Sequence, residues 1–123
     1  MADYLPKFTG ASATFTASAA ITGGRLVAVA GSRLVSVAGA DSAAVVGVAA
    51  FDVVTGDPVT VYTRPTGVHS LVASGAIEAG AKVISATAGK VATITTGTET
   101  GVNPIGIALQ PAADLDVVDV MFI

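Results

Sequence analysis

The chain has 123 residues, no cysteine and a formal net charge of −3, with 52% hydrophobic and only 12% charged residues. This length fits one domain, and the lack of cysteine excludes a disulfide framework. The six basic residues are scattered singly, which argues against nucleic-acid binding because that function needs a clustered basic face. Soluble proteins usually carry about 25% charged residues. The low content of charged residues therefore indicates a surface of small, neutral side chains that is partly covered by other subunits.

The first 20 residues differ in composition from the rest. Pro6, Gly10 and a Ser/Thr/Ala run up to residue 20 predict an extended N-terminal arm over residues 1–20, followed by a single β domain over residues 21–123. A solvated, disordered tail would be poor in aromatic residues, yet this arm holds three of the chain's six. We therefore expect the arm to dock, either on a partner protein or on its own domain, through Tyr4, Leu5, Phe8 and Phe15.

The remaining residues carry strand signals. Short segments rich in Val, Ile and Thr are separated by glycine-containing turns, a pattern typical of a sandwich or barrel. Several segments alternate apolar and polar residues, so that one face of each strand is buried. The predicted strands cover residues 25–30, 33–37, 45–48, 58–62, 82–85, 90–95, 105–109 and 116–122.

The two halves of the chain repeat one another. Ile21, Gly24 and Val27 have the same spacing as Ile77, Gly80 and Val83. Gly47 and Gly106 each precede a Val-x-Val strand at the same separation. The sequence therefore predicts two related β units of about 55 residues, packed into one compact barrel-like body; two copies indicate a duplication and not a solenoid.

No catalytic, metal-binding or cofactor-binding site is expected. The only histidine, His69, lies in a predicted turn that leads into a strand, and we interpret it as a surface or interface residue. One histidine without cysteine cannot form an ordinary zinc site, and the acidic residues near the C-terminus lack the EF-hand pattern. No Gly-x-Ser-x-Gly elbow and no phosphate-binding glycine motif occur. The sequence predicts a protein that is not an enzyme.

A membrane location is also not expected. The longest apolar stretch, residues 43–51, has nine residues, whereas a spanning helix needs about 20. The N-terminus carries Asp3 and Lys7 without an apolar segment behind them, so we expect no signal peptide. The protein should act where it is made, or in a particle assembled there.

An ordered series of motifs over nearly the whole chain resembles the small capsid decoration (cement) proteins of tailed bacteriophages. The series consists of short glycine-, alanine- and valine-rich segments and an opening Met-Ala-Asp-Tyr-Leu-Pro. The segments that carry the resemblance are residues 45–49, 56–61, 73–77, 79–83, 88–91, 105–108 and 118–120.

The resemblance implies a β-tulip or barrel body and no catalytic residues. It further implies a homotrimer at three-fold and quasi-three-fold positions on the capsid exterior, where it clamps subunits of the major capsid protein. Such a protein would be made in the host cytoplasm and carried on the virion. The arm residues Tyr4, Leu5, Phe8 and Phe15 are then candidates for contact with the capsid or with a neighbouring subunit.

The alternative is a β-sandwich module that binds carbohydrate or mediates adhesion. That function needs exposed aromatic rings to stack on sugars, and the chain has no tryptophan. Outside the arm only Phe51, Tyr62 and Phe122 are aromatic, and we expect Phe51 and Phe122 in the core.

Overall fold

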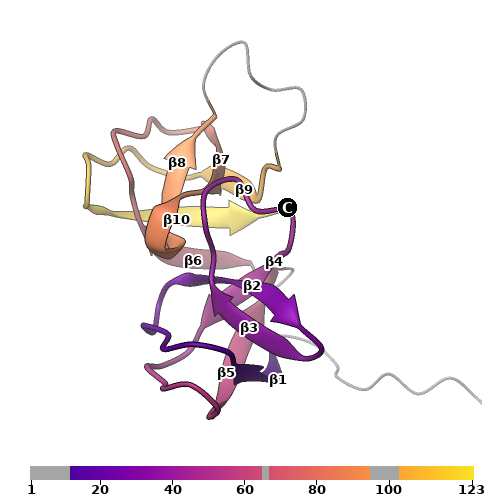
Figure 1. Ribbon diagram of the computed structural model, residues 1–123. Coiled ribbons are helices and arrows are strands. Elements are labelled where there is room, and N and C mark those ends of the chain that lie inside the picture. Colours follow the sequence, from indigo (N-terminus) through magenta and orange to yellow (C-terminus); the bar gives the residue numbers. More distant parts are fainter. Residues whose placement is uncertain (1–11, 65–66, 95–102) are drawn as a thin grey trace, which may run out of the picture.

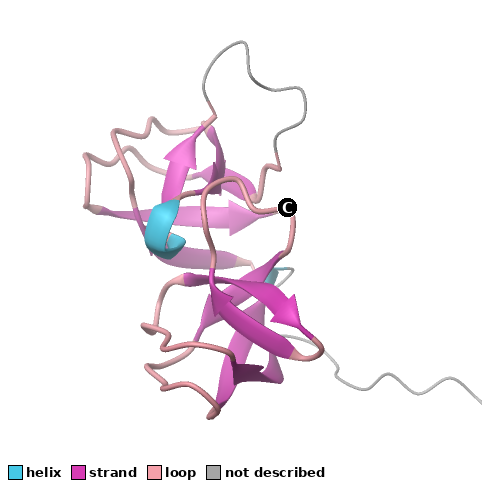
Figure 2. Ribbon diagram, viewed as in Figure 1, coloured by secondary structure: helices cyan, strands magenta, loops and turns pink. Residues whose placement is uncertain are grey.

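A computed structural model describes residues 12–64, 67–94 and 103–123. Its regular secondary structure is almost entirely β-strand (Figure 2), arranged in two lobes stacked one above the other (Figure 1). The first unit (residues 12–63) and the second unit (residues 68–122) hold five strands each. They are β1 (Ser12–Ala17), β2 (Leu26–Gly31), β3 (Leu34–Val37), β4 (Val45–Ala49) and β5 (Pro58–Thr63), then β6 (Val68–Val72), β7 (Lys82–Ser85), β8 (Val91–Thr93), β9 (Gly106–Ala108) and β10 (Val117–Phe122).

The first unit is a closed barrel with the strand order β1-β3-β2-β4-β5. Strand β1 closes it, because β1 pairs antiparallel with β5 along its length and parallel with β3 at Thr16 and Ala17. The predicted arm over residues 1–20 is therefore wrong from residue 12 onward. Residues 12–17 are a barrel strand, and Ala17 is buried in the core. Residues 1–11 lie outside the described part of the chain.

The second unit repeats the topology of the first. Its sheet has the order β6-β10-β9-β7-β8. The closed first barrel, read from β1 in the opposite direction, has the corresponding order β1-β5-β4-β2-β3. The parallel pair Ala17–Val35 that closes the first barrel has its counterpart in a parallel bridge between Ala73 and Val91. The antiparallel bridge Ile21–Val53 likewise corresponds to Ile77–Ala112. The predicted duplication is thus present in the backbone pairing.

Two equivalent glycines explain part of the sequence repeat. A Cβ atom built on Gly47 would lie 2.0 Å from the carbonyl oxygen of Tyr62, and one built on Gly106 would lie 2.5 Å from that of Met121. Each glycine lets its strand pass close against the neighbouring strand, β5 or β10, where any side chain would collide with backbone. The equal separation of Gly47 and Gly106 from the strands that follow them therefore reflects a backbone contact that both units share.

The two units share a hydrophobic core. One cluster, confined to the first barrel, contains Val27, Val35, Val59 and Val61. The other cluster contains the interior of the second unit together with Leu26, Ala28, Ala38, Val45 and Val48 of the first. Strand β2 therefore contributes to both clusters, and the two units pack as one body. The predicted mainly β, barrel-containing fold is confirmed, although each unit forms a sheet of its own.

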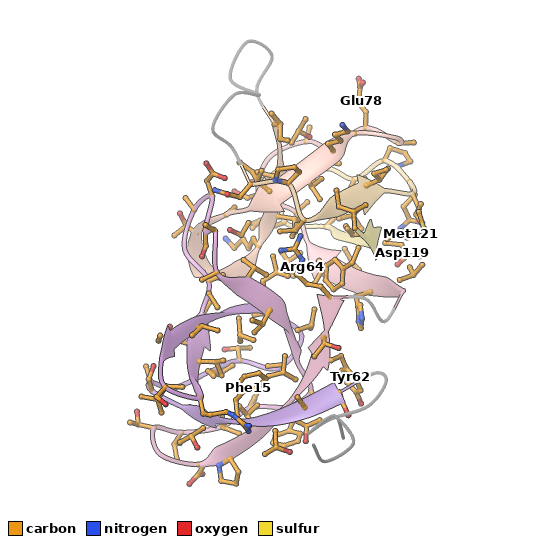
Figure 3. The ribbon with its side chains drawn as sticks, turned by 90° about the vertical axis from the view of Figure 1, so that its right-hand side faces the viewer. Phe15, Tyr62, Arg64, Glu78, Asp119 and Met121 are labelled. Atoms are coloured by element: carbon orange, nitrogen blue, oxygen red, sulfur yellow. The ribbon has the colours of Figure 1, made fainter. Side chains whose placement is uncertain are left out.

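Hydrogen bonds also join the two units. Ser85, a fully buried polar residue of β7, donates its hydroxyl to the carbonyl of Gly39 at 2.8 Å and accepts from the backbone N–H of Ser42 at 2.9 Å. The guanidinium of Arg64 lies at the junction (Figure 3) and donates to the carbonyls of Val45 at 3.4 Å, Pro104 at 3.2 Å and Ile123 at 3.2 Å. These bonds fix the first unit's loops against the second unit.

Candidate interaction surface

Of the residues proposed from the sequence as contacts, only Phe15 lies in the described part of the chain. Phe15 is a half-buried residue of β1 and packs against the core of the first barrel (Figure 3). Phe15 therefore packs against its own domain, which is one of the two alternatives given for the arm. Tyr4, Leu5 and Phe8 lie outside the described residues, and their role as contacts stays a prediction.

Three rings meet where the two units join. The ring of His69 lies 6.0 Å from that of Tyr62 in the first unit and 5.1 Å from that of Phe122 in the second, measured between centroids. His69 is the second residue of β6 and pairs with Val120 of β10, so its predicted position in a turn is wrong. Partial burial lowers the pKa of His69 from its usual value of 6.5, because desolvation disfavours the charged imidazolium.

This pKa shift predicts a pH dependence of stability. Because the folded state binds the proton more weakly than the unfolded chain, the free energy of unfolding should be highest above pH 6.5 and should fall as the pH drops below it. Urea unfolding measured from pH 7.5 to pH 5.5 checks this expectation. His69→Gln should lose most of the slope in this window, and an unchanged slope in that variant would assign the effect to other groups.

The outer face of strands β6 and β10 carries two exposed apolar pairs. Across these two strands, Val68 faces Met121 and Val72 faces Val117, with the pair Ser70–Asp119 between them. Val68, Val117 and Met121 are 51%, 55% and 42% exposed. The Ser70 hydroxyl donates to the Asp119 carboxylate at 2.8 Å, which leaves an apolar pair on each side. We call these residues the β6–β10 face.

The duplication provides an internal comparison for this face. In the first unit the equivalent pairs across β1 and β5 are Ser12–Tyr62, Thr14–Thr60 and Thr16–Pro58. The first unit thus has Ser and Thr on β1 where the second has Val68 and Val72 on β6. The positions of Val68 and Val72 on β6 are thus polar in the first unit, whereas those of Val117 and Met121 on β10 hold Pro58 and Tyr62 there, so the fold does not require apolar residues on this edge strand. The β6–β10 face is a candidate for contact with another segment or protein.

Leu115 lies in the turn that precedes β10. It is 60% exposed and has a φ of 68°, in the left-handed region that non-glycine residues rarely adopt. The equivalent residue of the first unit is Gly56, with a φ of 89°; its N–H bonds to the carbonyl of Ala17, as that of Leu115 does to Ala73. The turn is therefore kept in both units, although the second has no glycine at this position.

Among the described residues, no cluster of side chains is suited to metal binding. They contain no group of three or more His, Cys, Asp or Glu side chains placed to hold a metal ion. A hollow of about 250 Å³ is lined by Ala81, Lys82, Thr93 and Ile94, a set without a nucleophile–base pair. Within the same ranges, no helix is long and apolar enough to cross a membrane.

The exposure of the aromatic residues corrects one expectation. Phe122 is buried as expected, but Phe51 is 47% exposed, because it follows the end of β4 and lies in the turn that precedes β5. The carbohydrate-binding alternative gains little from this correction, since the exposed ring of Tyr62 already packs beside His69 and Phe51 belongs to no ring cluster among the described residues.

The fold is similar to that of a phage structural protein. The crystal structure of the N-terminal base of the head fiber protein gp8.5 of bacteriophage phi29 superimposes with a TM-score of 0.72 at 22% sequence identity, over 91% of this chain and 92% of that one. At this identity the match establishes the shared fold. No curated protein sequence matches the chain.

A family model gives the clearest assignment. The model of the phage cement protein family matches residues 8–122, which include both β units and the junction between them. The chain belongs to the phage cement protein family.

Proposed function

We propose that the protein binds the outside of a phage capsid and stabilises the shell by bridging neighbouring subunits of the major capsid protein. The observation that carries this proposal is the family match, which extends over residues 8–122. The low content of charged residues supports it, because an uncharged surface loses little solvation energy when another protein covers it.

The structure suits bridging in a mechanical sense. A bridge resists the separation of two capsomers only if it does not deform first. Here the two units share one core and are further joined through Ser85 and Arg64, so a load applied to one unit passes to the other. Each contact needs to contribute only a few kcal/mol, because many copies act on one shell and a bridge raises the effective concentration of its second contact.

The proposal includes three copies per site, at three-fold and quasi-three-fold positions. Self-association would cover part of the apolar surface that a monomer of this composition exposes. Of the arm residues, Tyr4, Leu5 and Phe8 are proposed as contributors to contact with the capsid or a neighbouring subunit. Phe15 anchors that segment, since it already packs on the first barrel.

Sedimentation with capsids tests this function. The purified protein should pellet with expanded capsids that lack it and should raise the temperature at which those capsids release their contents. Light scattering should report about three times 11.9 kDa, at least for protein bound to the shell. Binding to glycans without any binding to capsids would favour the carbohydrate-binding alternative, and a protein that is monomeric both free and on particles would exclude the trimer.

A further inference from the structure

The β6–β10 face is the strongest feature left without an occupant in the described structure. Val68 and Val72 of β6 are apolar where the first unit has Ser12 and Thr16, and they lie opposite the exposed Met121 and Val117 of β10. We propose that the N-terminal segment of the same chain, residues 1–11, docks on this face. This docking is proposed for the free protein and needs no capsid, so it stands apart from the contacts proposed for Tyr4 and Phe8 on the shell.

The direction of strand β1 supports docking by the N-terminal segment of the same chain. Strand β1 is antiparallel to β5, and β5 ends where the chain passes to the second unit. The chain that precedes Ser12 therefore enters β1 from the end of the barrel that faces the second unit. Ser12 pairs with Tyr62, and Tyr62, Asp119 and Met121 lie along one side of the molecule (Figure 3).

The length of the segment is sufficient. Eleven extended residues span about 36 Å, whereas the stretch of β10 from Val117 to Met121 covers about 13 Å. Phe8 precedes Ser12 by the same four residues, so an extended chain brings it about 13 Å beyond the end of β1. The apolar pair nearest the first unit, Val68 and Met121, lies at the beginning of β6, close to that end.

The spacing of the aromatic residues matches the spacing of the face. Tyr4 and Phe8 are four residues apart, as are Val68 and Val72 on β6 and Val117 and Met121 on β10. In an extended segment, Tyr4 and Phe8 point to the same side. Phe8 then packs on Val68 and Met121, and Tyr4 packs on Val72 and Val117, while Leu5 and Lys7 point away from the sheet. This arrangement leaves Leu5 available for a second partner.

Engineered cysteines test the arrangement, because the natural chain has none. The double variant Tyr4→Cys/Val117→Cys should form a disulfide within one chain under mild oxidation, seen as a loss of free thiols in a species of monomer mass. The matched control is Tyr4→Cys/Pro58→Cys, because Pro58 is the first unit's equivalent of Val117 on its outer face. The control should keep its thiols. Equal oxidation in both variants, or none in either, would overturn the proposal.

The same experiment separates exchange between copies from docking within one chain. A disulfide-linked dimer in the Tyr4/Val117 variant would overturn the proposal and show that the segment docks on a second copy. Both measurements use the free protein. A failure here therefore leaves capsid binding untouched, and a failure to bind capsids leaves the disulfide result standing.

Trypsin provides an independent measurement on a chain without added cysteines. Lys7 is the only basic residue in residues 1–11, so cleavage after it reports whether the segment is docked. The variant Val68→Ser/Val72→Thr introduces the first unit's Ser12 and Thr16 at the equivalent positions and should be cut there about tenfold faster, because cleavage follows the undocked population. Equal cleavage rates in wild type and variant would overturn the proposal, provided that both unfold at the same urea concentration.

Discussion

Replacing Gly47 by alanine is expected to lower the free energy of unfolding by about 3 kcal/mol. The added Cβ atom would lie 2.0 Å from the carbonyl oxygen of Tyr62, far inside van der Waals contact. The obstacle is backbone and not the end of a flexible side chain, so relief requires strands β4 and β5 to separate. Urea unfolding measures the loss. Because β4 and β5 are paired at Gly47, amide protection should fall first along these two strands.

The matched control is Gly39→Ala. An added Cβ atom at Gly39 meets no other atom within 4 Å, and its φ is not in the left-handed region. This substitution should change stability by less than about 1 kcal/mol and can raise it, because alanine restricts the unfolded chain. Equal unfolding midpoints for the two variants would show that the close approach of β4 to β5 does not govern this glycine.

The second large effect is expected from Leu26→Ala, at about 2–5 kcal/mol. Leu26 lies on β2 of the first unit, but its fully buried side chain belongs to the core that the second unit contributes. The cavity left by the substitution lies between the two units. We therefore expect a single unfolding transition that moves as a whole, with lower amide protection in both units.

Val29→Ala is the control for Leu26→Ala, since Val29 lies on the same strand but is 45% exposed. It should lower the free energy of unfolding by less than about 1 kcal/mol. If Leu26→Ala reduced protection in the first unit alone, or split unfolding into two transitions, the units would be independent and the shared core would not couple them.

The sequence predicted most of the strands and the duplication, for identifiable reasons. Alternating valines such as Val118 and Val120 place every second side chain inside, and both are fully buried. Close glycines such as Gly47 and Gly106 recur because both copies need the same backbone approach. These signals are local or repeat at a fixed spacing, so one sequence contains them.

The sequence did not predict strand β1, because backbone pairing with neighbouring strands stabilises it. Its residues are mainly Ser, Thr and Ala, and it is held by pairing with β5 and β3. No periodicity of that segment reveals a parallel pair with a strand 18 residues further along, as between Ala17 and Val35. Similarly, β6 was anticipated only as the strand that follows a turn at His69.

The candidate surface was only partly predictable. The sequence drew attention to Tyr4, Leu5, Phe8 and Phe15, but the apolar residues of the β6–β10 face looked like ordinary strand residues. Alignment of the two halves would have found the face, since Ser12 and Thr16 take the places of Val68 and Val72. The left-handed φ of Leu115 cannot be seen in any sequence pattern, because glycine is the residue that usually marks such a turn.

The shared core has a consequence for the order in which the chain is made. The first unit is contiguous in sequence and can close its barrel as soon as residue 63 has left the ribosome. At that moment Leu26, Val45 and Val48 have no covering layer, since their packing partners belong to the second unit. Translation adds about 5–20 residues per second. The nascent first barrel therefore exposes these apolar side chains to solvent for several seconds, until the second unit has been made. Where many copies are translated at once, this interval is when neighbouring nascent chains are most prone to associate wrongly.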